Sequence, residues 1–185
     1  MTSLILDIET LARTPDAVIT EIALLVFSVP QFDVVAELTL KPNILDQIEK
    51  FRNVEPETIA FHRSKGSLPQ AIGDLSPEST IQAMKAFIAE HNPRHVWIQG
   101  PDFDGPIIEN ICTQFVRPII ENFCQQSDQP LPWEYWRTRD ARTAWDLAFP
   151  GVKHAPRPHR AIEDCRATLT DLSASLRTLN RTSAA

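Results

Sequence analysis

The segment Leu4-Ile5-Leu6-Asp7-Ile8-Glu9-Thr10 combines a strand pattern with two closely spaced acids. Alternate side chains of a β-strand point to opposite faces, so Asp7 and Glu9 share one face with Ile5. Two carboxylates on one face repel each other, and burying them is costly unless a cation lies between them. Mg²⁺ and Mn²⁺ take carboxylate oxygens as ligands. The segment therefore predicts a strand ending in a metal site, or alternatively in a solvated acidic turn.

The composition is that of one globular domain. The chain has 185 residues, of which 43% are hydrophobic and 23% are charged. We expect a single domain over residues 1–181 and a frayed tail over residues 182–185. No segment reads as a signal peptide or a membrane span. The three cysteines, Cys112, Cys124 and Cys165, lack metal-ligand spacing, which predicts reduced thiols in a cytoplasmic protein.

The net charge of −6 and the pI near 5.3 exclude nucleic-acid binding by bulk electrostatic attraction. They do not exclude an enzyme that acts on nucleic acid. Bound cations can reverse the field of an acidic site, and a few arginines can bind phosphates.

The first forty residues predict three strands, over residues 4–10, 17–29 and 34–40. The second is apolar nearly throughout, as in a strand that is buried on both faces. The third alternates cleanly between apolar and polar residues. Short links between them predict an antiparallel meander.

The rest of the chain predicts helices that alternate with two more strands. Helical spacing and caps indicate helices over about residues 44–51, 56–65, 77–91, 107–126, 143–149 and 161–179. Pro118 is expected to kink or split the fourth of these helices. A short strand is expected over residues 95–99, and a last one within residues 133–139. This order predicts an α/β fold, in which helices cover a mixed sheet.

Acids at two further positions in the chain could join Asp7 and Glu9 in a metal site. Asp104 follows the strand over residues 95–99 and lies at the expected start of a helix, where α/β folds place ligands. An aspartate at that position can equally cap the helix. Asp102 competes for the role, but we prefer Asp104, because Phe103 can then pack inward.

The segment from His159 to Asp164 supplies the other acid and a candidate base. The two residues are five positions apart, so they do not share a helix face. We therefore expect His159 on the loop or the first turn and Asp164 on the helix. Such a pair can straddle a metal site, with the carboxylate bound to metal and the imidazole near water. A structural or exposed histidine is the alternative.

Together these residues resemble the DEDDh 3′–5′ exonucleases of the ribonuclease-H-like superfamily. Asp7, Glu9, Asp104, His159 and Asp164 fill the family pattern in order, over nearly the whole chain. The local sequence is similar to that of a branch that contains a T-even phage exonuclease and a mycobacterial exoribonuclease. The similar fragments are residues 7–10, 100–104, 132–133 with 139–143, and 159–165.

The resemblance implies a ribonuclease-H-like mixed five-stranded sheet flanked by helices on both faces. It also implies hydrolysis from a 3′ end that releases nucleoside 5′-monophosphates, with two Mg²⁺ or Mn²⁺ ions per site. Two such ions can stabilise the attacking and leaving oxygens of an in-line displacement. Asp7, Glu9, Asp104 and Asp164 are then the metal ligands, and His159 takes the proton from the attacking water.

The expected partners are single-stranded nucleic acid or 3′ overhangs, with no membrane, and a homodimer is one assembly that such relatives form. DNA and RNA both fit. Substrate contacts are expected from Thr10, Leu11, Phe61 and Arg142. Leu11 can wedge against the terminal base or simply pack in its loop. The branch differs from this chain at Gln99 and Gly100 and in the aromatic pair that Phe61 and His62 replace.

Three other functions compete. A carboxylate-dependent endonuclease or strand-transfer enzyme usually lacks the histidine of this pattern. A binding module without catalysis would be expected to have lost one of the five residues, and none is missing. A structural domain with acids on its surface would not bind Mn²⁺ tightly.

Overall fold

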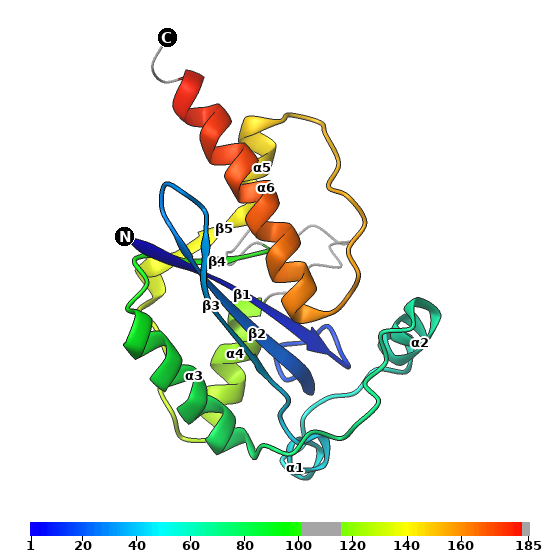
Figure 1. Cartoon of the computed structure of the whole chain (residues 1–185). Coiled ribbons are helices and arrows are strands. Elements are labelled where there is room, and N and C mark those ends of the chain that lie inside the picture. The colour runs from blue at the N-terminus through cyan, green and yellow to red at the C-terminus, as the bar shows by residue number, and fades with distance from the viewer. Residues whose placement is uncertain (101–115, 183–185) are drawn as a thin grey trace.

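The computed structural model describes residues 1–100 and 116–182 (Figure 1). One five-stranded sheet forms the centre, in the order β3-β2-β1-β4-β5. Its strands are β1 (Thr2–Thr10), β2 (Ile19–Ser28), β3 (Val34–Leu40), β4 (Val96–Ile98) and β5 (Thr138–Asp140). The pairs β1–β2 and β2–β3 are antiparallel, whereas β1–β4 and β4–β5 are parallel. The predicted meander and mixed sheet are therefore confirmed.

Six helices surround the sheet in the described residues. They are α1 (Ile44–Glu49), α2 (Pro56–Lys65), α3 (Pro77–His91), α4 (Val116–Gln126), α5 (Ala141–Ala148) and α6 (Ala161–Thr182). The caps of α3 agree with the sequence: the Ser76 hydroxyl accepts a hydrogen bond from the Ser79 amide, and Asn92 ends the helix in a left-handed conformation. Gly66 ends α2 in the same way.

The alternation of β1 creates two cores, one on each face of the sheet. Leu4, Leu6 and Ile8 pack with α3 and α4, whereas Ile5 packs with α5 and α6. Figure 1 shows α6 lying across one face and α3 with α4 on the other. β2 contributes to both cores, because it is apolar on both faces. Helices on both faces are thus confirmed.

Three boundaries differ from the sequence-based prediction. The last strand is only three residues long, and a 3₁₀ turn over Tyr135–Arg137 precedes it. The next helix begins at Ala141 rather than at residue 143, because the Asp140 carboxylate caps it. α6 extends through Thr182, where the tail was expected to begin, and residues 183–185 lie outside the described residues. Residues 107–115, where the helix containing Pro118 was expected to begin, also lie outside them.

α1 buries a polar residue instead of its apolar ones. Leu45 and Ile48 are exposed, as is Phe51, which lies just beyond the end of the helix. The buried residue is Gln47, whose amide exchanges two hydrogen bonds of 2.8 Å with the backbone of Ile19. Side-chain pairing with the first residue of β2 outweighs apolar packing here, because a buried backbone group without a partner is costly.

No described helix has the length and apolar character needed to cross a membrane. Cys124 and Cys165 are buried free thiols, and Cys112 lies outside the described residues.

We expect the substitution Gln47→Ala to lower the free energy of unfolding by about 2 kcal/mol, because it leaves the N–H and C=O groups of Ile19 buried without their partner. Urea denaturation measures this change. Glu49→Ala, on an exposed position of the same helix, serves as control and should shift stability by less than about 0.5 kcal/mol. Equal effects of the two substitutions would contradict the role of Gln47.

Candidate active site

The parallel strands β1, β4 and β5 end at the same edge of the sheet, and a cavity of about 460 Å³ opens there. Ligand sites of α/β sheets lie at this carboxyl edge. Acidic, basic and aromatic side chains share the lining. They are Asp7, Glu9, Arg13, Glu57, Thr58, Phe61, Gln99, Arg142, Arg157, His159 and Asp164.

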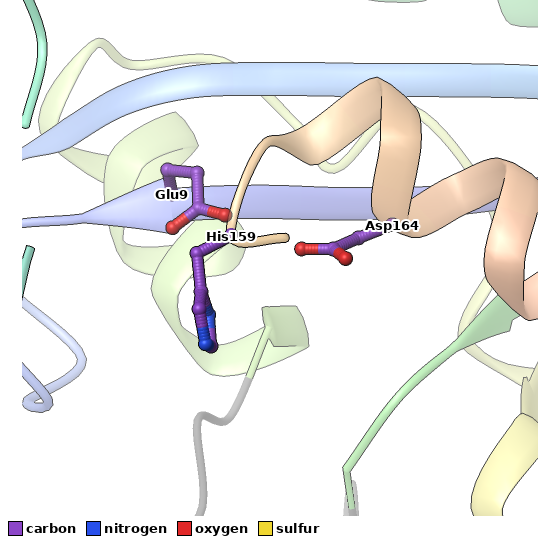
Figure 2. A group of neighbouring side chains, drawn as sticks. All are labelled: Glu9, His159 and Asp164. Carbon is purple, nitrogen blue, oxygen red and sulfur yellow. The ribbon is translucent and has the colours of Figure 1, made fainter. Parts of the chain in front are cut away.

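Three residues from two distant parts of the chain converge in this cavity. One ligand atom from each of Glu9, His159 and Asp164 lies within 4.8 Å of the others. Figure 2 shows the carboxylates of Glu9, on β1, and Asp164, on α6, pointing toward one another, with the His159 ring beside them. Two oxygens on opposite sides of one Mg²⁺ lie about 4 Å apart. The spread is therefore close to that of a metal site.

Asp7 joins the cavity from the same face of β1 as Glu9, as the strand alternation predicted. It is half-buried and lines the cavity, but it is not among the three residues whose ligand atoms converge within 4.8 Å. Its expected place between two ions stays a prediction.

The carboxylates strongly disfavour their ionised forms in the absence of metal. Burial, and then the charges of Asp164 and Glu21, raise the pKa of Glu9 to about 8. Burial also raises the pKa of Asp164 to about 6. Burial, followed by the charges of Glu9 and Asp164, raises the pKa of Asp7 well above its usual range. A bound cation would remove this penalty, because it supplies the missing opposite charge.

One buried carboxylate oxygen of the cluster lacks the partner that a metal ion could provide. Asp164 Oδ1 is buried and has no hydrogen-bond partner in the described part of the chain. A buried acceptor without a partner costs free energy, and a metal ion would satisfy it. The residues present therefore fit a hard divalent cation.

His159 occupies a tight turn just before α6, as expected. Its backbone has a φ of 57°, in the left-handed region that few residues other than glycine adopt. Its ring meets the Phe61 ring edge-on, with centroids 4.9 Å apart. Burial, followed by the charge of Lys65, lowers the pKa of His159. The imidazole is thus neutral, and able to accept a proton, at neutral pH.

A second histidine, His62 on α2, supports the end of β1. Its ring is buried, and its two nitrogens lie 2.9 Å from the Thr10 carbonyl oxygen and 2.9 Å from the Ser67 hydroxyl. His62 Nε2 also lies 3.9 Å from Glu9 Oε2, and burial lowers the pKa of the ring. From the sequence, His62 was expected only as half of an aromatic pair. The role of His62 depends on how α2 packs against the end of β1, which the sequence does not show.

Glu21 is another residue of the site that was not predicted from the sequence. It faces Glu9 across the β1–β2 ladder, and its carboxylate accepts a hydrogen bond of 3.3 Å from the Ala161 amide, at the start of α6. This contact connects the sheet to the segment that carries His159 and Asp164. An acid within the otherwise apolar second strand was the available signal.

Arg157 places a positive charge at the cavity, and hydrogen bonding fixes the orientation of its guanidinium. Its guanidinium donates a hydrogen bond of 2.6 Å to Asp171 of α6, and His154 Nδ1 lies 2.9 Å from the same oxygen. Charge from Arg157 opposes the raised pKa values of Asp7 and Asp164. The arginine therefore lies within electrostatic reach of the acids.

The predicted substrate residues fall into two groups. Phe61 and Arg142 line the cavity, and Asp140 orients the first turn that carries Arg142 by capping α5. Thr10 and Leu11 are buried and are not among the lining residues, so their substrate contacts stay a prediction. Asp104, the expected fourth acid, lies outside the described residues.

We expect the metal-free protein to lose stability as the pH rises from about 5 to about 8. In that range folded Glu9 and Asp164 retain protons that the unfolded chain releases, because their pKa values are raised. Asp164→Asn should stabilise the metal-free protein at pH 8 by on the order of 2 kcal/mol and reduce the gain on adding Mn²⁺. Thermal unfolding with and without Mn²⁺ measures both effects.

The matched control is Glu163→Gln, which removes the same charge from the exposed neighbouring position. It should leave both the pH dependence and the gain from Mn²⁺ in place. A wild-type melting temperature that Mn²⁺ leaves unchanged would count against a metal site.

Comparisons with known proteins agree with this geometry. Exonuclease I superposes with a TM-score of 0.64 at 13% identity, over 94% of this chain and 40% of that chain. The zinc-bound complex of E. coli ExoI with ssDNA gives a TM-score of 0.56 at 14% identity, over 94% and 40%. A full-length 3′-exonuclease gives 0.59 at 10% identity, over 95% and 81%. The chain thus spans about two fifths of the exonuclease I chains.

No curated protein sequence matches the chain significantly. The structural matches show a shared fold, the ribonuclease-H-like fold of the exonucleases. The profile of the 3′-5′ exoribonuclease Rv2179c-like domain matches residues 2–176. Since this match covers nearly the whole sequence, the chain belongs to the Rv2179c-like 3′-5′ exoribonuclease domain family, within the DEDDh exonuclease superfamily.

Proposed function

We propose that this protein is a metal-dependent 3′–5′ exonuclease that removes nucleoside 5′-monophosphates from the 3′ end of single-stranded nucleic acid. The observation that carries the proposal is the convergence of Glu9, His159 and Asp164 in one cavity, beside Asp7. Family membership supports the reaction class. The family description names an exoribonuclease, and ExoI has been solved with single-stranded DNA. RNA is therefore the first substrate to test, with DNA beside it.

In this proposal Asp7, Glu9 and Asp164 hold two divalent cations, Mg²⁺ or Mn²⁺, and Asp104 is a further ligand. When bound, the cations neutralise the phosphodiester and stabilise the charge that develops on the attacking and leaving oxygens. The raised pKa values of the acids support this role, because cation binding and deprotonation favour each other.

His159 is the proposed general base. The attacking water gives its proton to the imidazole, and its oxygen bonds to phosphorus. The bond from phosphorus to the 3′ oxygen then breaks, and solvent protonates that oxygen. The products are a nucleoside 5′-monophosphate and a strand that is shorter by one nucleotide. His62, which supports the Thr10 carbonyl and lies near Glu9, is a positioning residue in this scheme.

Arg142 and Arg157 are proposed to bind phosphates of the substrate, and Phe61 to pack against the terminal nucleotide. The three side chains share the cavity with the acids. Arg157 reaches it already oriented by Asp171, so little conformational freedom remains to be lost on binding.

We expect His159→Asn to lower kcat by about 10²- to 10⁴-fold, because it removes the proton acceptor. Asparagine tolerates the left-handed backbone at this position, so the fold should persist. Release of labelled mononucleotide from 3′-labelled RNA and DNA, with Mg²⁺ or Mn²⁺, measures the rate. His91→Asn, at the end of α3, is the control. Unchanged turnover in the His159 variant would reject its role as base.

The pH profile can separate the base from the metal ligands. Activity should fall as the pH drops below the ordinary imidazole value of 6.5, because the lowered pKa of His159 keeps the ring neutral above it. If protonation of Glu9 or Asp164 causes part of the fall in activity at low pH, raising the Mn²⁺ concentration should shift that part of the pH profile to lower pH. The part that protonation of His159 causes should not shift. We expect kcat at saturating metal to retain one acidic limb, which is absent in His159→Asn.

A further inference from the structure

A second hollow, of about 450 Å³, lies at the other edge of the sheet. It is lined by Asn92, Arg94, His95, Trp136, Arg137 and Arg139. All but one of these residues precede β4 or β5, and Arg139 is the second residue of β5, whereas the active-site cavity follows the ends of the parallel strands. The Arg94 amide bonds to the Thr2 carbonyl, seven residues before Glu9. At about 3.3 Å per residue, Arg94 therefore lies about 20 Å from Glu9, whereas Arg139, which is level with Ile5 through Trp97, lies about 13 Å before Glu9 along the strands.

The hollow concentrates positive charge on an acidic protein. Three arginines and a histidine line it, and none of its described lining residues is acidic, although the chain has a net charge of −6. Besides burial, the charges of Arg139 and Arg94 lower the pKa of His95. Cations held together in this way repel one another, and a bound anion would relieve the repulsion.

The arginines have different tasks. Arg137 is committed to the protein, through an ion pair of 2.7 Å with Glu134 and hydrogen bonds of 3.1 Å to the Asn92 side chain and the Pro93 carbonyl. Arg94 and Arg139 are exposed. One nitrogen of Arg139 donates two hydrogen bonds of 2.7 Å to backbone carbonyls, which fixes the direction of its guanidinium. Arg137 thus shapes the hollow, and Arg94 and Arg139 offer charge to a ligand.

Large aromatic rings border these cations. The side chains of Tyr135 and Trp136 are 61% and 60% exposed, and their rings meet edge-on with centroids 5.2 Å apart. Exposed aromatic rings next to arginines are the surfaces on which single-stranded nucleic acids stack their bases. An inorganic anion would use only the arginines, so the exposed rings favour a ligand with both phosphates and bases.

We propose that this hollow binds a segment of single-stranded nucleic acid, with phosphates on Arg94 and Arg139 and a base stacked on Trp136. As a site for the body of the substrate strand it rests on the proposed exonuclease function. Because Arg94 lies about 20 Å from Glu9, a long strand can reach both Arg94 and the active site, whereas a dinucleotide bound at the active site cannot reach Arg94. The hollow would therefore contribute to affinity for long substrates and not to the chemical step.

The test compares Arg94→Ala and Trp136→Ala with the control Lys41→Ala, which removes an exposed cation next to β3, at the far side of the sheet. Binding is measured by fluorescence anisotropy with a labelled long single strand, without divalent cation. Both test variants should bind about 5- to 50-fold more weakly than the wild type. Arg94→Ala should also reduce the slope of log affinity against log salt by about 0.7, and Trp136→Ala should leave it unchanged.

A kinetic test separates this site from the active site. For the long strand, KM should rise in both variants while kcat stays constant. For a dinucleotide, neither value should change. Unchanged affinity for the long strand, or an equal loss with the dinucleotide, would overturn the proposal. So would a loss of self-association, seen by sedimentation, without a loss of strand binding, because the hollow would then be an interface between copies of the chain.

The binding measurement does not require hydrolysis. If the wild type cleaved nothing, the exonuclease proposal would fail, but weaker strand binding by the two variants would still support this hollow. If cleavage proceeded and binding were equal in all variants, only the hollow would be rejected.

Discussion

Repulsion between carboxylates is the constraint on which this structure depends. Asp7 and Glu9 share a strand face, Glu21 lies on the neighbouring strand, and Asp164 approaches from α6. An isolated cluster of this kind would drive its elements apart. Here hydrophobic residues outside the acid cluster hold β1 and α6 together, because Ile5 on β1 and Leu169 on α6 belong to one buried core. The hydrophobic effect thus fixes the distance between groups that would otherwise separate.

The parallel pairing of β1, β4 and β5 converts this packing into a site. It brings strand ends from remote parts of the sequence to one edge, together with the first turns of α5 and α6. The antiparallel strands β2 and β3 extend the sheet on the other side. A separate hydrophobic core on each face stabilises the sheet, so the side chains at its edge are positioned by a rigid support.

The sequence predicted the parts that depend on local periodicity. The alternation in β1 placed Asp7 and Glu9 on one face, and the five-residue spacing placed His159 before a helix and Asp164 on it. It did not predict the contacts of Gln47 with Ile19, of His62 with Thr10 or of Arg157 with Asp171, because these partners are not neighbours in the sequence. It predicted a helix over residues 44–51 from its apolar spacing, but not that Gln47 would be its buried residue. Local pattern shows which face a residue occupies, and only tertiary structure shows what that face meets.

The left-handed turn at His159 has a consequence for how this family can diverge. Most side chains are strained in that conformation, but glycine and asparagine are not. A single codon change to asparagine would therefore remove the imidazole while the turn, α6 and both cores stay intact. Such a variant would keep the fold and the carboxylate cluster while it lacks the imidazole. The geometry that positions the imidazole thus also makes its loss easy to survive.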